Sequence, residues 1–189
     1  MAGLALLDRE GEAGLTMRAL GRELGVEAMA LYHHLPSREA LLGEIVGRFL
    51  AAVDLAGEGP WEARLVASAW AYREAALAHP AAFRLLLAGS SPEAEAAFAD
   101  RLLGLFLQAG FPPPEAARAY LGVRAFLDGA LLQALKASPE AAPDQVHLGR
   151  CAPALGRDLA KAHFAYGLER HCAELRRQLK AFPVARLGR

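Results

Sequence analysis

The sequence predicts an all-α protein, and three observations support that class. Hydrophobic residues make up 54% of the chain, and most of them are Ala and Leu, which favour helices over strands. Apolar side chains recur every three or four residues, and no run alternates as a strand would. Gly and Pro separate the helical runs. With 189 residues, the chain is long enough for one large or two small domains with a substantial core.

The charge balance gives no sign of a nucleic-acid partner. The chain has 21 basic and 21 acidic residues, which is a formal net charge of +0. Between Met1 and Leu50 the acidic residues outnumber the arginines. We therefore expect weak non-specific binding to DNA, so that any selectivity would come from particular side chains on one face.

Cysteine usage and the start of the chain indicate the compartment. Two cysteines, Cys151 and Cys172, are too few for a disulfide framework, and no charged leader or long apolar span begins the chain. These features predict a cytoplasmic protein without a membrane partner. His147 lies four residues before Cys151, and His171 precedes Cys172, but no second thiol or carboxylate repeats at ligand spacing. We therefore expect no metal ion and no other cofactor.

The first predicted helix runs from Met1 to Glu10. It contains Leu4, Leu6 and Leu7, which we expect to pack behind the segment that follows.

The stretch from Leu15 to Leu42 contains the start and stop signals of two short helices joined by a tight turn. The hydroxyl of Thr16 can cap a helix that runs to Leu24. Gly25 follows directly, and a glycine there can take the left-handed conformation that closes a helix. The chain is therefore expected to turn sharply before Val26.

A second short helix is expected over roughly Glu27 to His34. Leu31 and Leu35 are four residues apart and should face inward with Val26. The outward face then carries small and aromatic side chains, which are Ala28, Met29, Tyr32 and His33. This arrangement is a helix-turn-helix whose second helix can enter the major groove of DNA, although many helical hairpins with a glycine turn bind nothing.

A third helix and a domain boundary follow. Pro36 stops the second helix, and Ser37 can cap an amphipathic helix that contains Leu41, Leu42, Ile45, Val46 and Phe49. The segment from Asp54 to Pro60 is rich in Gly and breaks the pattern. We therefore predict a first domain over residues 1–53 and a second domain over residues 54–189.

The second domain begins with three predicted helices. The first runs from Trp61 to Ala78, and the second starts at Pro80. The third starts at Pro92, where Ser91 can cap it, and it closes at Gly110.

Two longer helices complete the second domain. One runs from Pro112 to Ala137 and is apolar on a broad side, which predicts two buried faces. Ser138 to Pro153 has little periodicity and is expected to be a long connection. The other helix covers roughly Leu155 to Leu179, and the residues from Lys180 onward are expected to form a loose tail.

Three runs in the first quarter of the chain carry a specific resemblance: GLTMRALGRELGV, ALYHHL and SREALL. These runs resemble the amino-terminal domain of TetR-family transcriptional regulators, and the stretch ALYHHLPSREALL is especially hard to obtain by chance. The resemblance implies a helix-turn-helix that reads double-stranded operator DNA. Family members begin with a longer helix and a basic arm, which Met1 to Glu10 does not provide, so we do not predict minor-groove contacts from it.

A second resemblance covers the carboxy-terminal part through WEARLVASAWAYREAALAHPAAFRLLL, LLGLFLQAGFPPPEAARAYLGV and FAYGLERHCAEL. These runs look like the ligand-binding domains of the same family. The resemblance implies a homodimer in which the helices from Pro114 to Ala137 and from Leu155 to Leu179 pack against their copies as a four-helix bundle. The expected interface residues are Leu127, Leu131, Phe164, Leu168, Cys172 and Leu175.

Such a dimer would hold two recognition helices about 34 Å apart and read a palindrome. Carried across by position, the expected DNA contacts are Thr16, Met17, Arg18, Ala28, Met29, Ala30, Tyr32, His33, His34 and Arg38. Arg18 is the strongest candidate for guanine, because a guanidinium can donate two hydrogen bonds to its major-groove edge. We expect Thr16, Met17 and Arg38 near the phosphate backbone. Small and apolar residues elsewhere predict contacts to thymine methyl groups, supplemented by DNA shape.

A small, mainly apolar effector is expected in the second domain. The candidate contacts are Trp70, Phe98, Phe106, Tyr120 and Arg124. Simple core packing would explain each aromatic residue as well. Asp128 lies four residues after Arg124, so an ion pair at the dimer seam would equally explain that arginine. The function expected overall is that of a repressor which the effector releases from DNA.

Two other functions stay open. One is a dimeric helical scaffold whose DNA-binding head, the first domain over residues 1–53, is degenerate. The acidic composition of the head permits this function. The other is an all-helical enzyme that uses His163 or His171, but the sequence has no nucleophile elbow, phosphate-binding glycine loop or paired-metal motif. We therefore expect no catalytic residues.

Overall fold

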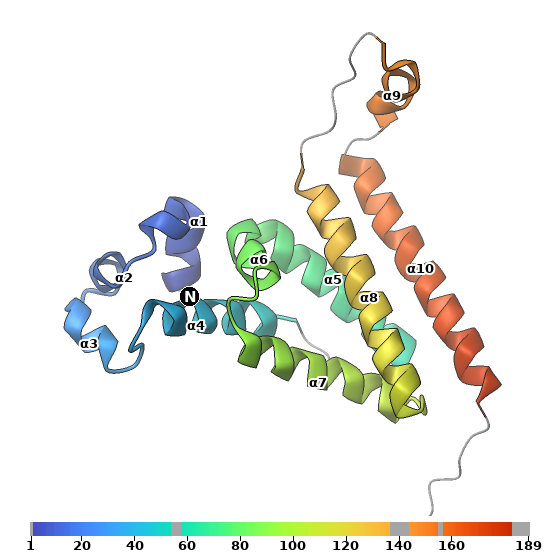
Figure 1. Cartoon of the computed structure of the whole chain (residues 1–189), viewed down its shortest axis with the longest axis horizontal. Coiled ribbons are helices and arrows are strands. Elements are labelled where there is room, and N and C mark those ends of the chain that lie inside the picture. Colours follow the sequence, from blue (N-terminus) through green and yellow to red (C-terminus); the bar gives the residue numbers. More distant parts are fainter. Residues whose placement is uncertain (1, 54–57, 137–143, 155–156, 183–189) are drawn as a thin grey trace, which may run out of the picture. The chain divides into compact units, whose positions relative to one another are not determined.

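The computed structural model describes residues 2–53, 58–136, 144–154 and 157–182 (Figure 1). Every regular element within these ranges is a helix, which confirms the predicted all-α class. The chain divides into two compact units, Met1–Leu102 and Leu103–Arg189. None of the helices in the described ranges is both long and apolar enough to cross a bilayer.

Among the described residues, the first unit contains six helices and the start of a seventh. They are α1 (Ala2–Gly14), α2 (Met17–Leu24), α3 (Ala28–Tyr32), α4 (Arg38–Ala51), α5 (Trp61–Ala78), α6 (Pro80–Leu87) and α7 (Pro92–Gln108), whose residues from Leu103 belong to the second unit. α1 is longer than predicted because it continues through a kink at Gly11, where φ is 70°. The predicted boundary segment falls partly outside the described residues, at 54–57.

The helix ends in the first unit follow local side-chain chemistry. The hydroxyl of Thr16 accepts a hydrogen bond from the amide of Ala19 at 3.1 Å, and that of Ser37 accepts one from the amide of Ala40 at 3.1 Å. Each bond satisfies an amide that has no partner within its helix. Gly25 has a φ of 68° and ends α2. The three predicted helix ends are confirmed.

An aromatic cluster joins four helices in the first unit. Phe49 of α4, Tyr72 of α5 and Phe83 of α6 lie with ring centroids 6.0–6.4 Å apart, and Phe98 of α7 stacks on Tyr72 at 6.0 Å. All four side chains are at most 3% exposed. The end of α4 is therefore packed into a core that also holds α5, α6 and α7.

The second unit contains the end of α7, α8 (Pro113–Ala134), α9 (Val146–Cys151), a short 3-10 helix (Ala152–Ala154) and α10 (Arg157–Ala181). α8 and α10 lie side by side (Figure 1). The ring of Phe126 on α8 stacks on His171 of α10 at 4.6 Å and lies 5.9 Å from Phe164. Gly167 permits this contact, because a Cβ there would overlap the Phe126 ring.

Two predictions for the second unit need correction. The segment from Ser138 to Pro153 is not a plain connection, since Val146–Cys151 forms α9; its residues 138–143 lie outside the described residues. Lys180 and Ala181 belong to α10 rather than to a tail, and residues 183–189 lie outside the described residues. Short helices such as α9 carry too few turns to show a periodic pattern in the sequence.

Candidate nucleic-acid interface

A closed glycine turn joins α2 to α3. The amide of Val26 donates to the carbonyl of Gly21 at 2.9 Å, and the amide of Gly25 donates to that of Arg22 at 3.3 Å. This pair of bonds is a Schellman motif, in which a left-handed residue reverses the chain. A Cβ at Gly21 would lie 2.7 Å from the carbonyl oxygen of Val26. Gly21 is therefore a second glycine that the turn requires, and the sequence analysis missed it.

α3 is short and presents its side chains to solvent. None of its residues, Ala28–Tyr32, is buried; Met29 is 75% exposed and Tyr32 is 44% exposed. The predicted helix over Glu27–His34 was too long, since His33 and His34 form a turn. Pro36 disfavours helical backbone at Leu35, the residue before it, so the chain is not expected to continue as a helix beyond this turn.

The inward-facing residues predicted around α3 are also corrected. Val26 is 45% exposed, while Leu31 and Leu35 are only partly buried. Val26 lies directly after the Schellman turn, where the chain runs over the surface between helices.

The structure keeps most predicted DNA-contacting side chains accessible. Arg18 on α2 is exposed. Thr16, Met29, Ala30, Tyr32, His33 and His34 are exposed as well, and Ala28 is partly exposed. The rings of His33 and His34 meet edge to face at 6.3 Å. These residues all come from the short stretch that contains α2, the turn and α3, so they lie on one part of the first unit.

Met17 differs from this set. Its side chain is only 7% exposed and belongs to the core of the head, so a contact of Met17 with the phosphate backbone of DNA would not come from its side chain. Met17 follows the cap residue Thr16, and the first amides of a helix have no partner within it. The backbone amide is therefore the group of Met17 that can face a phosphate.

Arg38 stabilises the head through hydrogen bonds to carbonyls outside α4. Its guanidinium donates to the carbonyl of Leu15 at 2.8 Å and to that of Glu12 at 3.0 Å, and it pairs with the Glu12 carboxylate at 3.2 Å. These bonds tie the start of α4 to the segment between α1 and α2. The predicted phosphate contact of Arg38 would compete with these three bonds.

Ion pairs use most of the positive charge in the head. Arg9 pairs with Glu23 at 2.8 Å, which raises the pKa of Arg9 and lowers that of Glu23 through their hydrogen bond. Arg48 forms an ion pair with Glu44, and Arg38 forms one with Glu12. Within the described part of the head, no ion pair is formed by Arg18 or Arg22. The charge that can meet DNA is thus concentrated on α2, and Arg22 joins Arg18 as a candidate.

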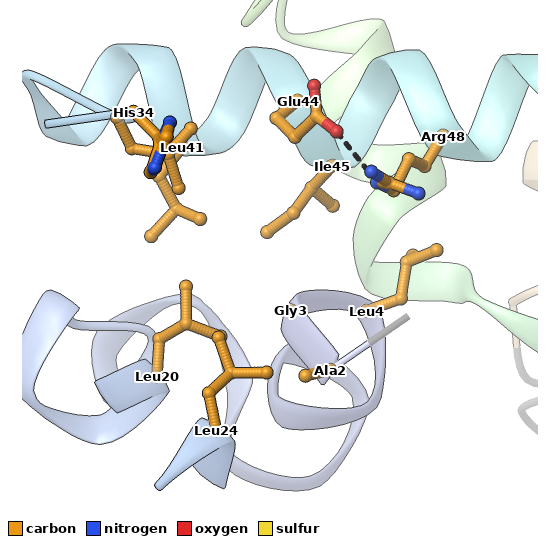
Figure 2. A pocket seen from close by; sticks show the side chains of 11 residues that line it. Ala2, Gly3, Leu4, Leu20, Leu24, His34, Leu41, Glu44, Ile45 and Arg48 are labelled. Atoms are coloured by element: carbon orange, nitrogen blue, oxygen red, sulfur yellow. Dashed lines mark hydrogen bonds and ion pairs between the residues drawn. The ribbon is translucent and has the colours of Figure 1, made fainter. Parts of the chain in front are cut away.

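A pocket of about 450 Å³ separates α1 and α2 from α4 within the first unit. Leucine and isoleucine side chains enter it from both sides (Figure 2). Its polar lining consists of His34 and of the pair Glu44 and Arg48, whose side chains are 2.7 Å apart. None of the predicted effector contacts lines this pocket. His34 therefore lies close to the start of α4 as well as to α3.

The predicted effector contacts fall into different surroundings. Phe98 and Phe106 are 3% and 0% exposed and pack in apolar cores, where Phe106 meets Phe111 at 5.7 Å. Trp70 and Tyr120 are partly exposed. The structure assigns Trp70 and Phe98 to the first unit and the other three to the second.

The one charged candidate for effector binding, Arg124, pairs with Asp128 as the sequence suggested. The distance between Nη2 and Oδ2 is 3.0 Å, and the two side chains are 13% and 20% exposed. The two residues are four apart on α8, so the ion pair forms within one helix.

The predicted dimer residues are all buried within one chain. Leu127, Leu131, Phe164, Leu168, Cys172 and Leu175 are all at most 6% exposed in the single chain. α8 and α10 pack against each other, and these residues lie where the two helices meet or beside that contact. Other apolar side chains on the same helices remain exposed, and they are Leu121, Leu132, Leu159 and Tyr166.

Two family models match the chain. The model for bacterial regulatory proteins of the tetR family matches residues 1–45, and the model for the tetracyclin repressor-like C-terminal domain matches residues 54–173. The second match alone covers more than half of the chain.

Individual proteins give the same result. The tetracycline repressor protein class A from transposon 1721 of Escherichia coli is 35% identical over 138 residues, which are 70% of this chain and 63% of that repressor. The chain thus spans less than two thirds of that relative's length in the match. A crystal structure of a possible TetR family transcriptional regulator from Streptomyces coelicolor A3(2) is 31% identical, with a TM-score of 0.70 over 93% of this chain and 95% of the other.

A third relative is solved with a small molecule. The crystal structure of TetR-Q116A from Acinetobacter baumannii AYE in complex with minocycline is 26% identical, with a TM-score of 0.65 over 94% of this chain and 93% of the other. The capped helix-turn-helix, the helical fold and both family models agree, and the chain therefore belongs to the TetR family of bacterial transcriptional regulators.

Proposed function

We propose that the chain is a homodimeric repressor that binds a palindromic operator and is released from it by a small effector. The observation that carries this proposal is the geometry of the turn and of α3 within the head. A Schellman turn with two required glycines fixes α3 against α2, and α3 buries none of its side chains. A short helix that a closed turn holds in place and that keeps most of its side chains accessible is suited to bind in the major groove.

The proposed DNA contacts follow from exposure and charge. Arg18 would read guanine, while Arg22 and the amide of Met17 would contact phosphates. Met29 and Tyr32 would contact bases through apolar and aromatic surface. Because few cations face DNA, we expect a shallow dependence of affinity on salt, with specificity carried by shape and a small number of base contacts. A regulator of this kind would act in the cytoplasm, where bacterial operators lie.

The dimer would form through the exposed sides of α8 and α10. Leu121 is 63% exposed and Tyr166 is 59% exposed, although both belong to helices with well-buried opposite sides. Small residues at Gly122, Ala125 and Gly129 accompany Leu121 on the exposed side of α8. Apolar and small side chains on two adjacent helices are what a four-helix bundle between two copies needs.

The effector would bind within residues 54–189, which is the second domain that we propose. Tyr120 and Arg124 lie one turn apart on α8 and are partly exposed, so they can meet the polar end of a mainly apolar ligand. Trp70, Phe98 and Phe106 remain candidates for its apolar contacts. Minocycline is the first probe, because a similar protein is solved with it.

A DNA selection tests the proposal. Binding sites would be selected from random duplexes with the full chain, and affinity for the selected palindrome and for random DNA would be measured at several salt concentrations. We expect specific binding about 10³-fold or more tighter than random binding, together with a dimer on the DNA. Equal affinity for both duplexes would favour the scaffold with a degenerate head.

The effector is tested separately. Both tryptophans of the chain, Trp61 and Trp70, lie on α5, so their fluorescence reports on this part of the protein. Titration with minocycline should change the fluorescence of the wild type and release the selected operator, and Arg124→Ala should weaken both effects. Release by minocycline with unchanged affinity in Arg124→Ala would argue against a ligand contact at this residue.

A further inference from the structure

Arg101 of α7 closes the carboxyl end of α4. Its guanidinium donates to the carbonyl of Leu50 at 3.2 Å and to that of Val53 at 3.5 Å. Leu50 belongs to the last turn of α4, and Val53 follows the helix. The two partners are 51 and 48 residues away in sequence, so this contact joins parts of the first unit that the chain brings together only on folding.

An arginine suits this position for electrostatic and geometric reasons. The last carbonyls of a helix have no donor within the helix, and they carry the negative end of its dipole. A guanidinium offers several donors in a rigid plane, so it can serve two carbonyls at once. The guanidinium also lies 5.4 Å from the centre of the Phe98 ring, which limits how it can move.

α7 meets α4 at two further places. A Cβ built at Gly43 lies 3.4 Å from the hydroxyl oxygen of Ser91, and one built at Gly47 lies 3.9 Å from the Cβ of Ala94. With the Arg101 contact, the order of the three contacts shows that α4 and α7 run in the same direction (Figure 1). Both distances are those of ordinary van der Waals contact, so α4 and the start of α7 pack along these two glycines.

The two ends of α4 are thus held differently. Its first residue, Arg38, binds the carbonyls of Glu12 and Leu15. These bonds join the start of α4 to the end of α1 and the residues before α2. Its last turn is bound by Arg101, beside Phe49 and Phe98 of the aromatic cluster. α7 itself continues as one helix to Gln108, in the second unit.

We propose that Arg101 is a positioning residue that fixes the direction of α4, and with it the head, relative to α7. The consequence for DNA binding rests on the proposed function: in the dimer, Arg101 sets the separation of the two heads. It holds the heads at the operator spacing without contacting DNA. The recognition of bases within one half-site does not depend on it.

The first test needs neither DNA nor a dimer. Spin labels would be placed at Ala13→Cys in the head and Glu93→Cys at the start of α7, in a full chain that carries Cys151→Ser and Cys172→Ala. Both label sites are exposed. Arg101→Met keeps the apolar stem over Phe98 but loses the donors. We expect a broader distribution of the distance between the labels in Arg101→Met, and an unchanged distribution would overturn the proposal. Arg84→Ala, which removes an exposed arginine from α6, is the matched control.

The second test measures the consequence on DNA. Affinities would be compared for the selected palindrome, for palindromes with the half-sites one base pair closer or farther apart, and for one with a base changed inside a half-site. In Arg101→Met the preference for the correct spacing should fall by about 2- to 30-fold, while the penalty for the wrong base stays the same. Arg101→Lys keeps the positive charge but loses the planar guanidinium with its several donors. This variant should recover part of the spacing preference.

The outcomes separate the two proposals. An unchanged spacing preference in Arg101→Met would overturn the role of Arg101 in setting operator spacing. An equal loss of spacing and base preference would mean general disorder of the head, and it would also overturn this role. If the wild type selects no palindrome at all, the proposed function fails, whereas the distance measurement still decides whether Arg101 holds α4.

Discussion

Asp8 of α1 and His79, between α5 and α6, are joined by a 2.6 Å contact between Oδ2 and Nδ1. It links the first helix of the head to the corner where α5 ends and α6 begins, so it is a second connection between the head and the helices behind it. Because both side chains are about one third exposed, solvent screens this contact.

A double-mutant cycle measures this connection. Asp8→Ala and His79→Ala should each destabilise the protein, and the double variant should lose less than the sum of the two. We expect a coupling of about 0.5–1 kcal/mol from urea denaturation at pH 6. Additive losses would show that the two residues act independently.

Arg18→Ala tests base recognition. We expect a loss of about 1–3 kcal/mol on the selected operator and a relaxed preference at one base position, because the guanidinium would lose a bidentate partner. Arg22→Ala is the contrast, since a phosphate contact should weaken binding to all sequences alike and reduce the salt slope by about 1. Equal losses of Arg18→Ala on operator and random DNA would exclude a base contact.

Gly21→Ala tests the turn. The new methyl group would meet the carbonyl oxygen of Val26 at 2.7 Å, and we expect a loss of about 1–3 kcal/mol in the free energy of unfolding. Gly104→Ala is the matched control, because it lies inside α7 and a Cβ there meets nothing within 4 Å. That variant should be more stable by about 0.5–1 kcal/mol through helix propensity. Similar effects of both changes would contradict the role given to Gly21.

Glu39→Gln tests a pH-dependent helix cap. The pKa of Glu39 lies below its ordinary value of 4.5, since its carboxylate accepts hydrogen bonds from its own amide and from the hydroxyl of Ser37. A lowered pKa in the folded state means that ionised Glu39 stabilises the protein above pH 4.5 and that this contribution disappears as the pH falls below that value.

Melting temperatures at pH 7 and pH 3 check this expectation. Glu39→Gln should melt at a lower temperature than the wild type at pH 7, and the difference should shrink at pH 3. Glu74→Gln, on the exposed side of α5, controls for the loss of one negative charge. A difference between wild type and Glu39→Gln that stays constant with pH would rule out the ionised cap.

Tyr166→Glu and Leu121→Glu test the proposed dimer surface. Each change occurs twice across a symmetric interface and buries like charges, so the dissociation constant of the dimer should rise by about 30-fold or more. Light scattering coupled to size exclusion would detect the monomer. Leu87→Glu changes a leucine of α6 that is 37% exposed and lies outside α8 and α10, and it should leave the dimer intact. Dimers of undiminished stability in both test variants would place the interface elsewhere.

The structural features that the sequence predicted best are those that depend on residues close together in the chain. Thr16, Gly25 and Ser37 act within three or four positions of themselves, so their roles could be read directly from the pattern. The range of α5, Trp61–Ala78, was predicted to the residue because an 18-residue helix shows its periodicity clearly.

Long-range partners could not be predicted in this way. The apolar stripe that contains Leu127 and Phe164 predicts a buried face, but periodicity does not show whether a helix of the same chain or of a second copy covers it. Arg38 and Arg101 bind carbonyls far away in sequence, and every residue offers a carbonyl. Such contacts leave no compositional signal. The required glycine at position 21 could have been suspected, because a glycine inside a helix pattern near its end often marks a close approach.

The exposure of α3 has an evolutionary consequence. A helix without buried side chains contributes little packing energy, so substitutions at Met29 or Ala30 should change DNA preference at almost no cost in folding stability. The glycines and caps that orient α3 are fixed by backbone geometry and cannot vary in the same way. Selection can therefore give this scaffold new operators through a handful of surface positions while the fold remains unchanged.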